Sequence, residues 1–130
     1  MLTDVIRNPD NPDHFMRIKP VSREVTVTRK GIVLARSDRA LRIMEVGKDL
    51  YDPVFYLPID DVRTELTPVP DRSTHCPLKG DASYFAMDAG SIASPIAWTY
   101  DRSKSFADAL SGHIAFYPDA VSITEAGPET

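Results

Sequence analysis

The sequence predicts a single, mainly β domain, either a compact β-sandwich or a partly closed β-barrel. Segments in which apolar and polar residues alternate recur along the chain and indicate about eight or nine strands. Turn residues separate these segments at short intervals, and only one short segment has a helical pattern. A length of 130 residues, with 42% hydrophobic and 26% charged residues, is typical of one globular domain.

The first 22 residues are polar and contain three prolines, which is typical of extended chain. We therefore expect residues 1–22 to form an extended N-terminal arm that packs on the domain. Residues 23–124 are expected to form the single β domain, and residues 125–130 a polar tail.

Three strands are predicted after the arm, at residues 25–28, 32–35 and 40–46. A turn at Lys30 and Gly31 joins the first two, and another short turn leads to the third. Such closely spaced strands are expected to form a meander.

Two further strands are predicted at residues 54–57 and 62–66. Pro68 and Pro70 then predict a loop. This loop leads into residues 74–84, which we expect to lie as a loop over one face of the sheet.

The last third of the chain alternates again at residues 82–87 and 96–100. Residues 105–110 are the best helix candidate, with a serine at the capping position. Residues 113–117 and 121–124 are expected to pair as a closing hairpin.

Alternation divides the late strands into two different faces. One face is ordinary core and groups Phe85, Met87, Ala97, Ile114 and Phe116. The other face groups ring-containing side chains that also have a polar atom: Tyr84, Trp98, Tyr100, His113 and Tyr117. The second set is typical of a lined concavity or a wet interface, although a solvated face could have the same composition.

Cys76 is the only cysteine, and a cysteine nucleophile needs a neighbouring base or cation. His75 would point away from it in extended chain, so His113 is the better base, and Glu45 could orient it. Glu45 shares a strand face with Ile43 and needs a partner if that face is core. The alternative is that Cys76 is a small buried hydrophobe. We assign no metal site, because no CxxC, HxH or HExxH spacing occurs.

A ligand site is predicted around the same stretch. Lys79 before Gly80 provides a charge and a permissive backbone for an anion, although the sequence is not a P-loop. Trp98 and Tyr100 could stack on a planar group. The predicted ligand-binding residues are His75, Lys79, Tyr84, Trp98, Tyr100 and Tyr117.

These residues also carry a family resemblance. The blocks are Arg39-Ala40-Leu41 with Glu45, Tyr56-Leu57-Pro58 with Asp61-Val62, Thr74-His75-Cys76-Pro77 with Lys79-Gly80-Asp81-Ala82-Ser83-Tyr84, Ala97-Trp98 with Tyr100, and Gly112-His113-Ile114-Ala115-Phe116-Tyr117. Over residues 13–124 the chain resembles the bacterial and fungal family named domain of unknown function 427. The resemblance implies a compact, mainly β fold without an established activity. A nucleotidyltransferase label sometimes given to this family has no supporting motif here, because the Gly-Ser with paired aspartates on a strand is absent.

Three functions remain open at this point. The leading hypothesis is a module that binds a small polar or anionic ligand, and we assign no cofactor. The alternatives are a thiol- or histidine-dependent hydrolase or transferase, and an interaction protein whose aromatic face is a homodimer interface. A net charge of −4 argues against a nucleic-acid partner. The sequence has no signal peptide or membrane-spanning run, so we expect a cytoplasmic protein without a membrane partner.

Overall fold

The computed structural model describes residues 5–103 and 105–126 and consists mostly of antiparallel strands. Eight strands form one large sheet. In sheet order they are β1 (Ile6–Asn8), β2 (Asn11–Pro20), β5 (Leu41–Val46), β6 (Val54–Pro58), β10 (His113–Phe116), β9 (Ala97–Ser103), β8 (Gly80–Ala86) and β7 (Thr67–Cys76). The sheet has free edges at β1 and β7, so it does not close into a barrel. The prediction of a mainly β, sandwich-like fold is confirmed.

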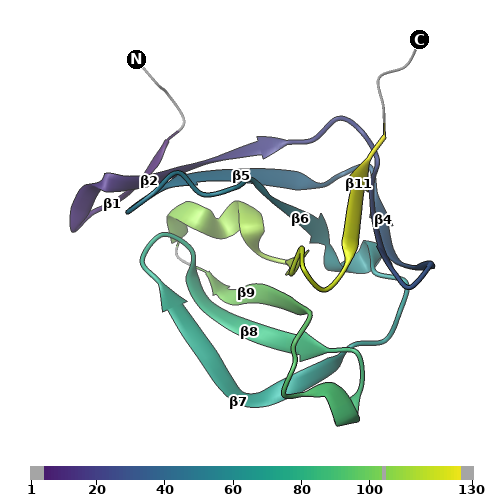
Figure 1. Ribbon diagram of the computed structural model, residues 1–130. Helices are drawn as coiled ribbons and strands as arrows, with labels where there is room; N and C mark the ends of the chain where they lie inside the picture. The colour runs from purple at the N-terminus through teal and green to yellow at the C-terminus, as the bar shows by residue number, and fades with distance from the viewer. Residues whose placement is uncertain (1–4, 104, 127–130) are drawn as a thin grey trace.

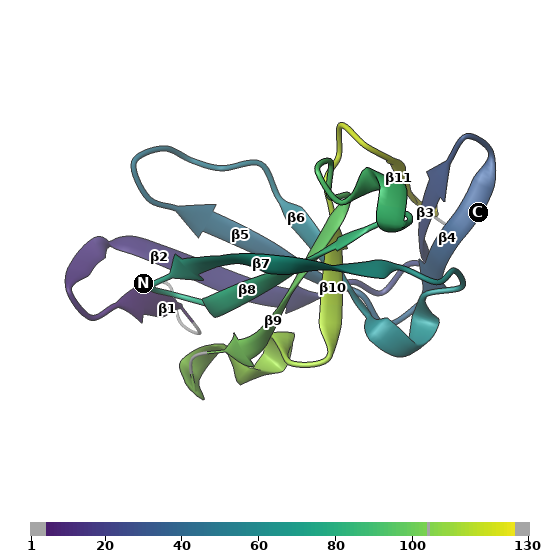
Figure 2. The same ribbon diagram turned by 90° about the horizontal axis from the view of Figure 1, so that it is seen from below.

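The large sheet is bent, so that its two ends face each other. Figure 1 shows β1, β2 and β5 above, and β7, β8 and β9 below. Side chains of both halves meet in one core cluster, in which Met16 and Ile43 from one half join Ala82 and Tyr100 from the other. Seen from below, β7 and β8 cross over β2 and β5 (Figure 2).

A second, three-stranded sheet has the order β11 (Ser122–Glu125), β3 (Val25–Arg29) and β4 (Ile32–Ser37). Lys30 and Gly31 join β3 to β4 with φ values of 51° and 79°. Two residues with positive φ are what a tight two-residue hairpin turn requires. Val25 and Leu34 of this sheet pack with Phe116 of the large sheet in a second core cluster.

The pairing of several strands differs from the prediction. β3 and β4 form a hairpin, but β5 pairs with β2 and β6, so the three strands are not a meander. β10 and β11 do not form the expected closing hairpin. β10 pairs with β6 and β9, while β11 pairs with β3. In both cases a short connection passes from one sheet to the other, which local turn residues do not reveal.

The segment from residue 62 to residue 76 is also different. The strand predicted at residues 62–66 is absent apart from a single bridge between Val62 and Ala35. The predicted proline loop is instead the ten-residue strand β7. Proline is tolerated there because β7 is an edge strand, which does not need every amide for pairing. The expected loop at residues 74–84 is therefore a hairpin of β7 and β8.

The chain ends and the helices complete the description. The predicted N-terminal arm contributes β1 and β2 to the large sheet. Residues 127–130 of the predicted tail lie outside the described residues. The described helices are short 3₁₀ segments, η1 (Ile59–Asp61), η2 (Ala89–Ser91) and η3 (Ser105–Leu110). None of the helices in the described part of the chain is long and apolar enough to cross a membrane.

Candidate functional site

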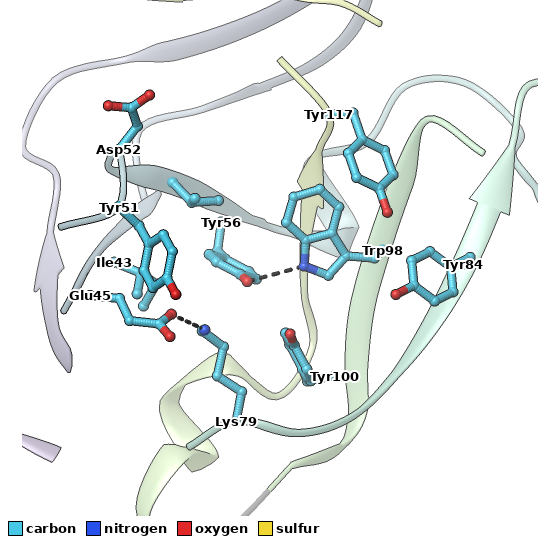
Figure 3. A pocket seen from close by; sticks show the side chains of 11 residues that line it. Ile43, Glu45, Tyr51, Asp52, Tyr56, Lys79, Tyr84, Trp98, Tyr100 and Tyr117 are labelled. Carbon is cyan, nitrogen blue, oxygen red and sulfur yellow. Dashed lines mark hydrogen bonds and ion pairs between the residues drawn. The ribbon is translucent and has the colours of Figure 1, made fainter. Parts of the chain in front are cut away.

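A cavity of about 210 Å³ lies between the two halves of the large sheet (Figure 3). We call it the aromatic cavity, because six aromatic side chains line it: Tyr51, Tyr56, Tyr84, Trp98, Tyr100 and Tyr117. Its other lining residues are Ile43, Glu45, Asp52, Val54 and Lys79. A cavity of roughly 150 Å³ can hold benzene, so this one suits a small molecule.

Four of these aromatic side chains form one wall of the cavity, because the alternation of side chains along neighbouring strands points them to the same face. Tyr84 on β8 lies directly opposite Trp98 on β9, and Tyr100 follows Trp98 by two residues on the same face. Tyr117 comes directly after β10, where its ring centre lies 4.6 Å from that of Trp98. The sequence correctly grouped these four side chains on one concave face. Their role in ligand binding stays a prediction.

A hydrogen bond fixes the centre of this wall. The indole nitrogen of Trp98 donates to the hydroxyl of Tyr56 over 3.1 Å, and the two rings meet edge to face. Tyr56 is only 2% exposed. Burial raises the pKa of both Tyr56 and Tyr100 far above its ordinary value, so both hydroxyls keep their protons. The wall thus offers fixed neutral hydroxyls.

We expect the Tyr56 hydroxyl to make the fold sensitive to alkali. In the unfolded chain tyrosine ionises near pH 10, whereas folded Tyr56 stays protonated. The unfolded state then binds fewer protons, so the free energy of unfolding should fall as the pH rises through about 10. Tyr56→Phe should cost about 1 kcal/mol at neutral pH, because Trp98 loses its acceptor. The variant should also lose less stability than the wild type between pH 8 and pH 10.5 in urea titrations, and an equal loss would refute this account.

Charged side chains form one side of the cavity. The Lys79 ammonium donates a short hydrogen bond to Oε1 of Glu45, and Nε2 of His14 donates to Oε2 over 2.8 Å. The Asn8 amide nitrogen lies 3.3 Å from the other His14 ring nitrogen. Burial alone would raise the pKa of Glu45, but the hydrogen bonds from Lys79 and His14 outweigh it and hold the pKa below its usual value. Glu45 is therefore a partly buried carboxylate that accepts hydrogen bonds from two donors, and these donors are the partners that its strand position required.

The lowered pKa of Glu45 predicts acid sensitivity. Below the ordinary glutamate pKa the unfolded chain takes up this proton before the folded chain does, so stability should fall as the pH drops. Urea unfolding between pH 7 and pH 3 should show a shallower dependence on pH for Glu45→Gln than for the wild type. Identical slopes for the two proteins would mean that the Glu45 contacts do not stabilise the fold.

Cys76 ends β7 at the edge of this charged group. Its sulfur lies 3.8 Å from the Lys79 ammonium and is half-buried. The predicted base is elsewhere: Nδ1 of His113 lies 3.0 Å from the Ser111 carbonyl, and His113 does not line the cavity. The structure thus brings Cys76 near Glu45 through Lys79, but it does not bring His113 to the cysteine.

His75 also lies outside the cavity. Its side chain is 60% exposed, and its ring nitrogen bonds Asp81 across the hairpin at 2.8 Å. In the described part of the chain, no three His, Cys, Asp or Glu side chains gather in a way that could hold a metal ion. The three histidines thus serve separate local contacts.

Sequence reasoning missed three residues of the site. His14 was considered as part of the arm and as a weak metal-ligand candidate, yet it bonds Glu45 through the pairing of β2 with β5. Tyr51 and Asp52 lie in the connection from β5 to β6, where no periodicity marks a residue as lining a cavity. The one signal in the sequence was Glu45, whose expected inward position required a hydrogen-bond donor as partner.

Comparison with known families identifies a family to which this chain is similar. A family model described as "Domain of unknown function (DUF427)" matches residues 17–127, which is most of the chain. The sequence resemblance noted above is thereby confirmed. The sequence matches no curated protein.

Proposed function

This chain belongs to the DUF427 family, whose description gives no function, so the site itself must indicate one. We propose that the protein binds a small polar ligand with a planar group in the aromatic cavity. The observation that carries this proposal is the lining of the cavity. Six aromatic side chains line one cavity together with the Glu45–Lys79 ion pair. An aromatic lining with a few fixed polar groups is typical of small-molecule sites.

The lining suggests how such a ligand would be held. A planar group would stack on Trp98 or Tyr100, and tyrosine hydroxyls would bond its polar atoms. Lys79 is 7% exposed and its charge is compensated by Glu45. We therefore expect Lys79 to act as a hydrogen-bond donor to the ligand and to contribute little net positive charge.

Two other functions receive less support. A thiol- or histidine-dependent hydrolase or transferase would need a base beside Cys76, and the candidate His113 has its own partner in the Ser111 carbonyl. A homodimer through the aromatic face would need that face exposed, but Tyr84 and Tyr100 are 8% and 9% exposed within one chain. We also propose a cytoplasmic location, where the single free thiol would stay reduced.

Filling the cavity should abolish binding without unfolding the protein. Val54 is half-buried and lines the cavity, so Val54→Phe would occupy space that a ligand needs. Ile32→Phe is the matched control, because Ile32 is 65% exposed and lines no part of the cavity. A thermal-shift screen of small planar polar compounds tests this. At about 100 times Kd a ligand adds about 2.7 kcal/mol to stability.

We expect compounds that raise the melting temperature of the wild type and of Ile32→Phe to have no effect on Val54→Phe. The proposal fails if such compounds stabilise Val54→Phe equally. It also fails if no planar polar compound at millimolar concentration stabilises the wild type.

A further inference from the structure

A second hollow of about 410 Å³ lies next to the aromatic cavity. Tyr117 lines both of them, so its side chain lies at the border between the two spaces. We call the second space the arginine hollow, because Arg29 and Arg72 line it together with Ser94 and Asp119. Two positive charges and one negative charge therefore border it.

A distortion in β7 aims Arg72 at the boundary of the two hollows. The register of β7 and β8 shifts between Pro68 and Ser73, and Asp71 has a φ of 56°. Irregularities of this kind redirect a side chain and are frequent near functional sites. The Arg72 guanidinium lies 5.0 Å from the ring centre of Tyr84, which lines the aromatic cavity. Arg72 is thus held over the cavity wall by stacking.

Arg29, at the end of β3, also lines the hollow and is held by a backbone contact. Its Nη1 donates to the carbonyl oxygen of Ala120 over 2.6 Å, which fixes the guanidinium and leaves further N–H groups. Among the described residues, no carboxylate forms an ion pair with Arg29 or Arg72. Elsewhere in the same set, Arg39 and Arg42 each bond a carboxylate, at 3.3 Å and 2.8 Å.

We propose that the arginine hollow is an anion subsite of the same ligand site. On this proposal the ligand carries its planar group in the aromatic cavity and a carboxylate or phosphate group between Arg72 and Arg29. Guanidinium groups bind both anions through paired hydrogen bonds. This inference rests on the proposed function. It moves the expected anion contact from Lys79, whose charge is compensated by Glu45, to two arginines that form no ion pair with a carboxylate in the described part of the chain.

The single tryptophan permits a direct test, because Trp98 lines the aromatic cavity and its fluorescence reports occupation there. The probes are benzoate, phenylacetate, 3-phenylpropionate and phenyl phosphate. Each is titrated against its neutral counterpart, which is the matching amide or, for phenyl phosphate, phenol. The three carboxylates differ in the distance from ring to anion, and phenyl phosphate distinguishes a phosphate from a carboxylate preference.

We expect the best anionic probe to bind about tenfold more tightly than its neutral counterpart, which corresponds to about 1.4 kcal/mol. Arg72→Gln should remove this advantage and leave the affinity of the neutral probe unchanged. Arg23→Gln is the control, because Arg23 is an exposed arginine that lines neither hollow.

The other outcomes separate the two claims. The anion subsite is refuted if anionic and neutral probes bind with equal affinity, or if Arg72→Gln retains the higher affinity for the anionic probe. Either result leaves the proposed ligand site in the aromatic cavity unaffected. If inorganic phosphate binds but no aromatic probe changes Trp98 fluorescence, the two hollows are not one site. If nothing changes Trp98 fluorescence at millimolar concentration, the proposed function fails and this inference fails with it.

Discussion

Replacing Lys79 with methionine is expected to lower the free energy of unfolding by about 3 kcal/mol, because the partly buried Glu45 carboxylate loses its ammonium partner. Lys79 is 7% exposed, and its partner Glu45 would keep only the bond from His14. Domains of this size have a total stability of about 5–15 kcal/mol, so the loss should be plain in urea unfolding at pH 7.

A double-mutant cycle separates the pair from other effects of the change. Glu45→Gln combined with Lys79→Met removes both charges, so it should be more stable than the sum of the two single changes predicts, by about 1 kcal/mol or more. Arg39→Met is the matched control, because Arg39 pairs with Asp61 but its side chain is 64% exposed. It should cost about 0.5 kcal/mol or less. Additive effects of the two single changes would show that Glu45 and Lys79 are not energetically coupled.

Alanine substitutions of the neighbours Phe116 and Tyr117 are expected to differ in effect: the first should mainly lower stability, and the second should mainly weaken ligand binding. Phe116 is 1% exposed and packs in the core between the two sheets, so Phe116→Ala should cost about 3–5 kcal/mol. Tyr117 is half-buried beside Trp98, so Tyr117→Ala should cost only about 1–2 kcal/mol.

Ligand affinity should depend on Tyr117 and not on Phe116. Phe116→Ala, measured at a temperature where it stays folded, should bind the compounds found in the thermal-shift screen with unchanged affinity. Tyr117→Ala should weaken them about tenfold, because a stacking wall is lost. If Phe116→Ala weakens binding as much as Tyr117→Ala does, the core and the cavity are not separate.

What the sequence predicted well depends on the period of two along a strand. Tyr84, Trp98, Tyr100 and Tyr117 were grouped correctly because successive side chains of one strand point to opposite faces. The inward position of Glu45 was predicted for the same reason. His113 shares this alternation but begins its strand and bonds Ser111, so it does not reach the cavity.

What the sequence did not predict depends on long-range pairing. The prolines of residues 67–76 indicated a loop, but an edge strand accepts them, and edge position is set by the order of the whole sheet. The contact of His14 with Glu45 likewise depends on the pairing of β2 with β5, two strands separated by the hairpin of β3 and β4. Local pattern carries no signal for either feature.

The central claim is that the aromatic cavity is a ligand site, and one resonance can test it. The chain has a single tryptophan, so labelling with 5-fluorotryptophan gives one ¹⁹F signal, from Trp98 in the cavity wall. We predict that planar polar compounds shift this signal in a saturable way in the wild type and in Ile32→Phe, and do not shift it in Val54→Phe. A signal that no such compound moves at millimolar concentration, or that moves equally in Val54→Phe, would contradict the claim.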